Sequence, residues 1–72
     1  MEVFMIISTY FKEDAGQRAR AEVVKNPDGT HKIDYYNISG DLFHEEYFPN
    51  KSVFYVEDAA KNWASGIKVL NG

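Results

Sequence analysis

The sequence has 72 residues, with 11 acidic and 8 basic side chains, a formal net charge of −3 and no cysteine. This length suffices for one domain, which we expect to span residues 1–72 as a single ββββα unit. The lack of cysteine excludes disulfides, thiolate zinc sites and thiol catalysis, and the acidic balance disfavours a nucleic-acid partner, because nucleic-acid binders neutralise phosphates with a basic surface.

The first predicted element is a strand over residues 3–11, a stretch rich in β-branched and aromatic side chains. Its near-continuous apolar character is typical of a strand covered on both faces. The polar stretch of residues 12–17 is expected to end it. The start of the chain lacks the basic leader and cleavage site of a signal peptide, and no apolar run reaches the roughly 18 residues of a membrane span. We therefore expect a cytoplasmic protein with no membrane contact.

Two hairpin turns give the clearest local signals. The turn at 26–30 has Pro27 where a type I turn fixes φ, and Gly29 where the chain needs a positive φ. It predicts flanking strands over residues 18–25 and 31–37. The turn at 37–41 repeats the pattern of Asn first and Gly fourth, and it predicts a fourth strand, Leu42–Phe48.

The turn at 26–30 also sets a register. It places Val23 opposite Ile33 and Ala21 opposite Tyr35, which gives one apolar sheet face. The residues between them form the other face, which is mixed in character: Glu22, Val24, Asp34 and Tyr36. A slip of one residue would exchange the two faces.

A helix is predicted over residues 53–65. Ser52 is a candidate N-cap, and Gly66 is a natural stop after the last turn. Apolar residues recur at spacings of three and four along one stripe: Val53, Val56, Ala60, Trp63 and Ile67. Trp63 is expected to anchor this stripe in the core, and the apolar tail over 67–70 is expected to pack on the sheet.

Together these elements predict a two-layer α+β fold, a four-stranded antiparallel meander sheet packed against one C-terminal helix. One sheet face meets the helix, and the other has no partner within the chain. That second face bears Tyr36, together with Leu42 or Phe43 depending on the register, while Phe54 and Tyr55 fall off the helical stripe. Apolar patches of this kind on small proteins usually mark protein contacts. The candidate interaction residues are therefore Tyr36, Leu42, Phe54 and Tyr55.

The second half of the chain carries a resemblance. A glycine hairpin at 34–42 leads into the acidic-aromatic stretch Glu45-Glu46-Tyr47-Phe48, and a helix with Glu57-Asp58-Ala59-Ala60 and Asn62-Trp63 follows. Over residues 34–66 this resembles a family of small uncharacterised proteins encoded by tailed phages of marine cyanobacteria (cyanophages). The resemblance implies a phage product that acts inside an infected host cell, and it implies no activity and no site residues.

One polar cluster has the residue types of a metal site. His44-Glu45-Glu46 is a possible set of metal ligands, but on a strand His44 and Glu46 share one side and Glu45 the other. The turn at 37–41 places His31 opposite Tyr47, on the other face from His44. Transition-metal sites usually need three or four convergent ligands. We therefore expect no metal site, no catalytic residue and no cofactor.

A basic region on neighbouring strands is a candidate surface for nucleic-acid binding. Basic side chains interleaved with aromatics on a sheet are a known platform for single strands: Arg18, Arg20, Lys25 and Lys32, near Tyr35 and Tyr36. Glu22 and Asp34 lie among them and cancel much of the local charge. We expect nucleic acid to bind weakly at best.

The leading functional hypothesis is a phage-encoded accessory protein that acts by binding an unidentified host or phage protein. We also expect a homodimer with Tyr36 near the centre of its contact, because a chain this short without disulfide or metal gains stability by burying surface between copies. One alternative is an acidic mimic that modulates a nucleic-acid process. A second is a small enzyme or ligand-binding protein that uses His44 and Glu46.

Overall fold

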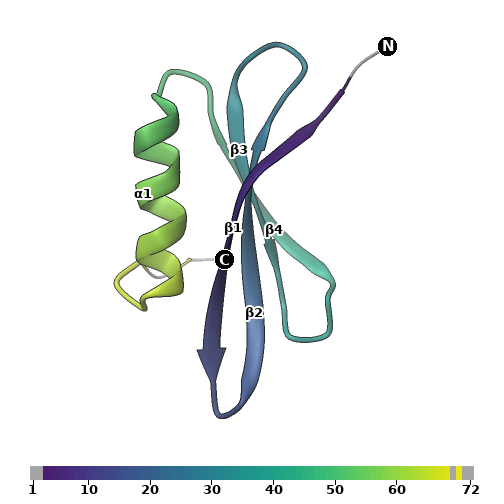
Figure 1. Ribbon diagram of the computed structural model, residues 1–72, viewed down its shortest axis with the longest axis vertical. Coiled ribbons are helices and arrows are strands. Elements are labelled where there is room, and N and C mark those ends of the chain that lie inside the picture. The colour runs from purple at the N-terminus through teal and green to yellow at the C-terminus, as the bar shows by residue number, and fades with distance from the viewer. Residues whose placement is uncertain (1–2, 69, 71–72) are drawn as a thin grey trace.

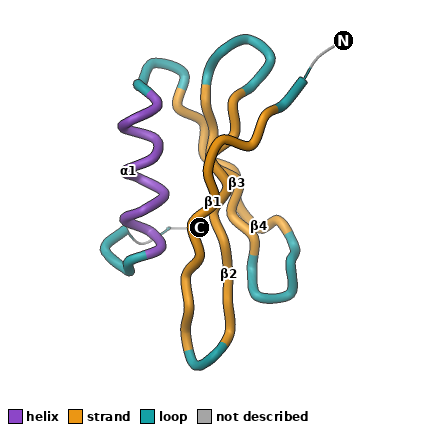
Figure 2. The backbone as a smooth tube through the Cα atoms, viewed as in Figure 1, coloured by secondary structure: helices purple, strands orange, loops and turns teal. Residues whose placement is uncertain are grey.

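The computed structural model describes residues 3–68 and residue 70. A four-stranded antiparallel sheet packs against one C-terminal helix, which confirms the predicted α+β fold and the meander order β1-β2-β3-β4. Figure 1 shows the helix along one side of the sheet, and Figure 2 shows the turns that join the strands. The elements are β1 (Met5–Asp14), β2 (Gln17–Lys25), β3 (His31–Tyr36), β4 (Leu42–Phe48) and α1 (Val53–Ala64).

The two predicted turns are present and share one hydrogen-bond pattern. In the first, Asn26 N donates to Thr30 O at 2.8 Å, and Gly29 N donates to Asn26 O at 3.0 Å. In the second, the amides of Asn37 and Gly40 make the equivalent bonds at 2.9 Å each. The glycines have φ values of +90° and +85°, the left-handed region that favours glycine.

A third hairpin joins β1 to β2. The expectation that the first strand ends before the polar stretch at 12–17 was wrong. β1 continues into that stretch as far as Asp14, and the chain turns at Ala15 and Gly16. Both turn residues have positive φ, +52° and +81°, as a two-residue hairpin turn requires. The paired strands therefore extend well beyond the end of β3 (Figure 1).

The predicted register between β2 and β3 is confirmed, with Val23 opposite Ile33 and Ala21 opposite Tyr35. The register between β3 and β4 was predicted wrongly, because an extra residue, Phe43, forms a β-bulge between Leu42 and His44. The bulge shifts the rest of β4 by one residue.

The bulge decides which aromatic residue joins the core. His31 faces Phe48 rather than Tyr47, and His31 and His44 lie on the same side of the sheet. Phe48 is thereby turned under the helix, where it is buried, and Tyr47 is turned outward. The free energy gained by burying the Phe48 ring offsets the loss of backbone hydrogen bonding at the bulge.

Helix α1 begins and ends at the predicted signals to within one residue. Tyr55 N donates to the Ser52 side chain at 3.2 Å, so Ser52 is the N-cap, and Gly66 has a φ of +83° after the last turn. Val56, Ala60 and Trp63 are buried as expected. Ile67 lies beyond the helix and is 74% exposed, so its place on the stripe was wrong. Among the described residues, no helix combines the length and the apolar character needed to cross a bilayer.

The core lies between the helix and the inner residues of the sheet. The Trp63 ring meets the edge of Tyr35 with a centroid distance of 5.1 Å. At the rim, Ser8 and Tyr10 donate to the Glu57 carboxylate at 2.6 Å and 2.5 Å, which ties β1 to the helix. The hydrogen bond to Glu57 raises the pKa of Tyr10.

The tail after the helix packs only in part as expected. Leu70 contacts the core, and Lys68 donates to the Glu46 carboxylate at 2.7 Å. Val69, which the expectation also included, lies outside the described residues.

The expectation that β1 is covered on both faces was wrong. β1 occupies one edge of the sheet, and a bulge at Ile7 interrupts its pairing with β2. The apolar side chains from Val3 to Ile7, at the start of β1 and just before it, are between 42% and 60% exposed.

Candidate interaction surface

The sheet face that points away from the helix is called the open face here. Ala21, Val23, Ile33 and Tyr35 point toward the helix and are fully buried. Because side chains alternate along a strand, their neighbours point the other way. The open face therefore includes side chains from every strand: Phe4, Ile6, Thr9 and Phe11 in and just before β1, Arg18, Arg20, Glu22 and Val24 on β2, Lys32, Asp34 and Tyr36 on β3, and Leu42, Glu45 and Tyr47 on β4.

A row of carboxylates crosses the middle of the open face. Glu22, Asp34 and Glu45 stand opposite one another on β2, β3 and β4. Each is held by a basic neighbour. Arg20 Nε lies 3.1 Å from Glu22 Oε2, and Lys32 Nζ lies 3.2 Å from Asp34 Oδ1 and 2.8 Å from Glu45 Oε2. The row is therefore ion-paired within the chain, while the buried Asp34 Oδ1 atom lacks a well-aligned hydrogen bond among the described residues.

The shared lysine shapes the ionisation of the row. Burial raises the pKa of Asp34, which is only 8% exposed, and Lys32 opposes that rise. The hydrogen bond from Lys32 lowers the pKa of Glu45. Burial acts to lower the pKa of Lys32, but its bonds to Glu45 and Asp34 outweigh burial and raise it. Lys32 is thus held as a cation between two carboxylates.

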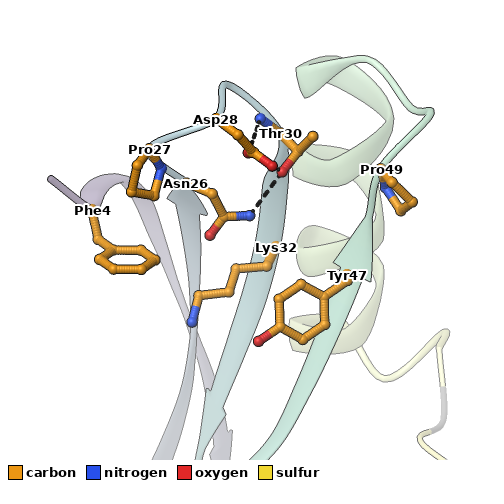
Figure 3. Close-up of a pocket in the computed structure, with 8 residues that line it drawn as sticks. All are labelled: Phe4, Asn26, Pro27, Asp28, Thr30, Lys32, Tyr47 and Pro49. Atoms are coloured by element: carbon orange, nitrogen blue, oxygen red, sulfur yellow. Dashed lines mark hydrogen bonds between the residues drawn. The ribbon is translucent and has the colours of Figure 1, made fainter. Parts of the chain in front are cut away.

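Aromatic side chains flank the row on both sides. Toward the 26–30 turn, Figure 3 shows Lys32 between the rings of Phe4 and Tyr47, at 5.4 Å and 5.8 Å from their centroids. Toward the other end, the Arg20 guanidinium lies 3.9 Å from the Tyr36 ring centroid, next to exposed Phe11 and Leu42. The face therefore alternates an aromatic band, a charged row and a second aromatic band.

Two shallow hollows mark the upper part of the open face. One, of about 500 Å³, is walled by Phe4, Tyr47, Pro27 and Pro49 (Figure 3). Asn26 also lines it, and its Oδ1 atom is buried with no hydrogen-bond partner among the described residues. The second hollow, of about 280 Å³, lies beside it between Phe4, Ile6 and Tyr36. The first hollow combines these apolar walls with the polar side chains of Asp28, Thr30 and Lys32, a mixture that suits a side chain from another molecule.

The structure brings together only half of the candidate interaction residues. Tyr36 and Leu42 pair directly at the end of β3 and β4 next to the 37–41 turn. Phe54 and Tyr55 are exposed as expected, but they follow the opposite end of β4, on the helix layer. The Tyr55 ring packs on Phe48 with a centroid distance of 6.0 Å.

Three further aromatic side chains of the open face were missed: Phe4, Phe11 and Tyr47. Strict alternation along each strand is the signal that finds such residues. The bulges at Ile7 and Phe43 interrupt it between the turns and both Phe4 and Tyr47, and Phe11 was missed because the hairpin at Ala15 and Gly16 was not predicted.

The side chains proposed as catalytic groups or metal ligands do not converge on one point. His44 lies beside Tyr35, 5.6 Å between ring centroids, and Glu46 accepts a hydrogen bond from Tyr35 Oη at 3.0 Å. Glu45 points to the open face, as the strand alternation predicted. Across residues 3–68 and 70, no group of three potential ligands is placed to hold a metal ion.

The chain matches no protein-family model, and no curated protein or solved structure is significantly similar to it. The resemblance to cyanophage proteins therefore stays a prediction. The function has to be argued from the surface itself.

Proposed function

We propose that this chain is a protein-interaction module that binds its partner through the open face. The observation that carries the proposal is the arrangement of charge and apolar surface on that face. Arg20 and Lys32 are bound to carboxylates of the same chain, while the aromatic bands beside them remain exposed. A face of this kind offers apolar area for contact without unpaired charge at its centre, as protein interfaces do.

The same contacts weigh against two other hypotheses. A nucleic-acid platform needs free cations to meet phosphates. Arg20 and Lys32 are committed to Glu22, Asp34 and Glu45, which leaves Arg18, over the Phe11 ring at one end of the open face, as a single exposed cation of that face in the described part of the chain. An acidic mimic needs free carboxylates, and these same ion pairs neutralise most of the row. The enzyme hypothesis based on His44 and Glu46 gains no support from the geometry, since Glu46 is engaged by Tyr35 and Lys68.

The partner is a host or phage protein, and the setting is the cytoplasm of an infected cell, as the resemblance over residues 34–66 implies. In this proposal the partner covers the aromatic bands and places a side chain in the hollow between Phe4 and Tyr47. Tyr36 contributes less than a bare ring would, because the Arg20 guanidinium already lies over it.

Affinity purification of the tagged protein from infected host cells tests the proposal. The open-face variants are Leu42→Glu and Tyr47→Glu, which place a charge in each aromatic band. Lys61→Glu, on an exposed helix position, is the matched control. We expect the control to retain the proteins that co-purify with the wild type and both open-face variants to lose them. Retention by both open-face variants, or loss only with Phe54→Glu at the helix start, would contradict the proposal.

A further inference from the structure

The first part of β1 combines two properties that rarely occur together. It lies at the edge of the sheet, and its side chains are apolar on both faces. All five residues from Val3 to Ile7 are more than 40% exposed. Figure 1 shows this part of the chain running away from the helix, so α1 does not cover it. Its sequence is that of a covered strand, but nothing in the described chain covers it.

Such an edge normally invites pairing, because its outer backbone groups have no partner in the sheet. Proteins usually protect edges with charged residues, prolines or bulges. The opposite edge, β4, has all three: Glu45 and Glu46 within it, Pro49 just after it and the bulge at Phe43. Residues 3–7 contain no charged residue and no proline, and their one protective feature is the bulge at Ile7. The two edges of the sheet are therefore protected very unequally.

We propose that residues 3–7, the start of β1 and the two residues before it, pair antiparallel with the same residues of a second copy, across a two-fold axis that passes near Met5. The two sheets then form one continuous eight-stranded sheet. Both helices lie on one side, and the two open faces lie side by side on the other. The proposal does not depend on the function of the open face, which stays uncovered.

A second copy fits this edge because the segment is complementary to itself. With the axis at Met5, Phe4 stands opposite the partner's Ile6, and Val3 stands opposite the partner's Ile7. Phe4 and Ile6 line the same hollow of the open face, so these opposing side chains share a face, as directly opposed residues in an antiparallel pair must. Every opposed pair is apolar, and the contact closes on itself. Pairing β1 with β4 of another copy would instead leave two free edges and grow into a filament.

Disulfide trapping tests the geometry of the pairing. Because the chain has no native cysteine, each single-cysteine variant carries one thiol, and any cross-link must join the two engineered cysteines. Single cysteines at Phe4, Met5, Ile6 and Ile7 are compared with Phe54→Cys, a thiol at a still more exposed position on the helix. Near the axis the two copies bring equivalent Cβ atoms within disulfide range. We expect Met5→Cys to cross-link about a hundredfold faster than Phe54→Cys at micromolar concentration, because pairing raises the effective thiol concentration. Equal rates at all five positions would overturn the proposal.

Light scattering during size exclusion tests the association without modification. The wild type should show twice the 8.3 kDa chain mass, and Met5→Lys should weaken the dimer at least about tenfold by burying a charge at the axis. Tyr36→Glu, on the open face, should leave the dimer unchanged, so the proposed contact moves from Tyr36, where the sequence alone placed it, to the edge of β1. A wild type that stays monomeric at every concentration overturns the proposal. So does a dimer lost with Tyr36→Glu but not with Met5→Lys, which would place the contact on the open face. A dimer that resists Met5→Lys contradicts it as well.

Discussion

The covered face and the open face of the sheet use alternate residues of the same strands, but they are built from different side chains. The covered face is apolar at its centre, where Ala21, Val23, Ile33 and Tyr35 are fully buried. The open face has its charges at the centre and its aromatic residues on either side. Burial of apolar area stabilises the first face. The open face keeps its charges paired, so that covering it would not bury an unpaired charge.

The largest expected effect lies on the covered face. Trp63→Ala should lower the free energy of unfolding by about 3–5 kcal/mol, because the ring fills the space between Tyr35 and the helix. Urea titration followed by circular dichroism measures it. Phe54→Ala, at an 80% exposed position of the same helix, should change stability by no more than about 0.5 kcal/mol. Equal midpoints for Trp63→Ala and wild type would mean that the helix faces elsewhere.

A smaller effect is expected at the centre of the open face. Lys32→Met should destabilise the protein by about 2 kcal/mol, because it leaves nearly buried Asp34 and its neighbour Glu45 without their shared cation. Lys61→Met, an exposed position on the helix, serves as the control. If both variants unfold at the wild-type urea concentration, the carboxylate row does not rely on Lys32, and the contrast between the faces weakens.

The smallest effect is a pH dependence carried by Tyr35. Burial, together with Glu46, raises the pKa of Tyr35 well above its usual range. The folded protein therefore keeps this proton at a pH where the unfolded chain has lost it. The stabilisation is complete below about pH 10 and falls as the pH rises further. Between about pH 9 and pH 11 the wild type should lose about 1 kcal/mol more than Tyr35→Phe. Parallel losses, measured by urea titration at each pH, would show that Tyr35 ionises in the folded state.

Elements of the fold could be predicted where short sequence patterns determine the local structure and tertiary packing does not change it. The Asn and Gly residues of two turns, the cap at Ser52 and the stripe through Trp63 each act within a few residues. The β1–β2 hairpin was not predicted as such, because Ala15 adopts a positive φ that alanine rarely takes. The bulge at Phe43 has no local signature either. It follows from the burial of Phe48, a tertiary effect.

The open face was predicted in part for the same reason. Tyr36 and Leu42 lie directly beside a turn whose geometry could be read, so their side of the sheet was clear. Phe4 and Tyr47 lie beyond the two bulges, where counting from the turn gives the wrong side. The predicted meander order already placed β1 at an edge of the sheet, but its exposure on both faces depends on how far the helix reaches along it, which residue composition does not reveal.

The bonds from Ser8 and Tyr10 to Glu57 have a consequence for how the chain folds. Each hairpin closes a turn of two to five residues, whereas these bonds join residues 49 and 47 positions apart. Closing that long loop costs roughly 2 kcal/mol more chain entropy than closing a hairpin. The sheet can therefore assemble by successive short closures, and docking of the helix is the one distant event. The bonds at Glu57 and the burial of Trp63 provide the free energy that holds this last closure in place.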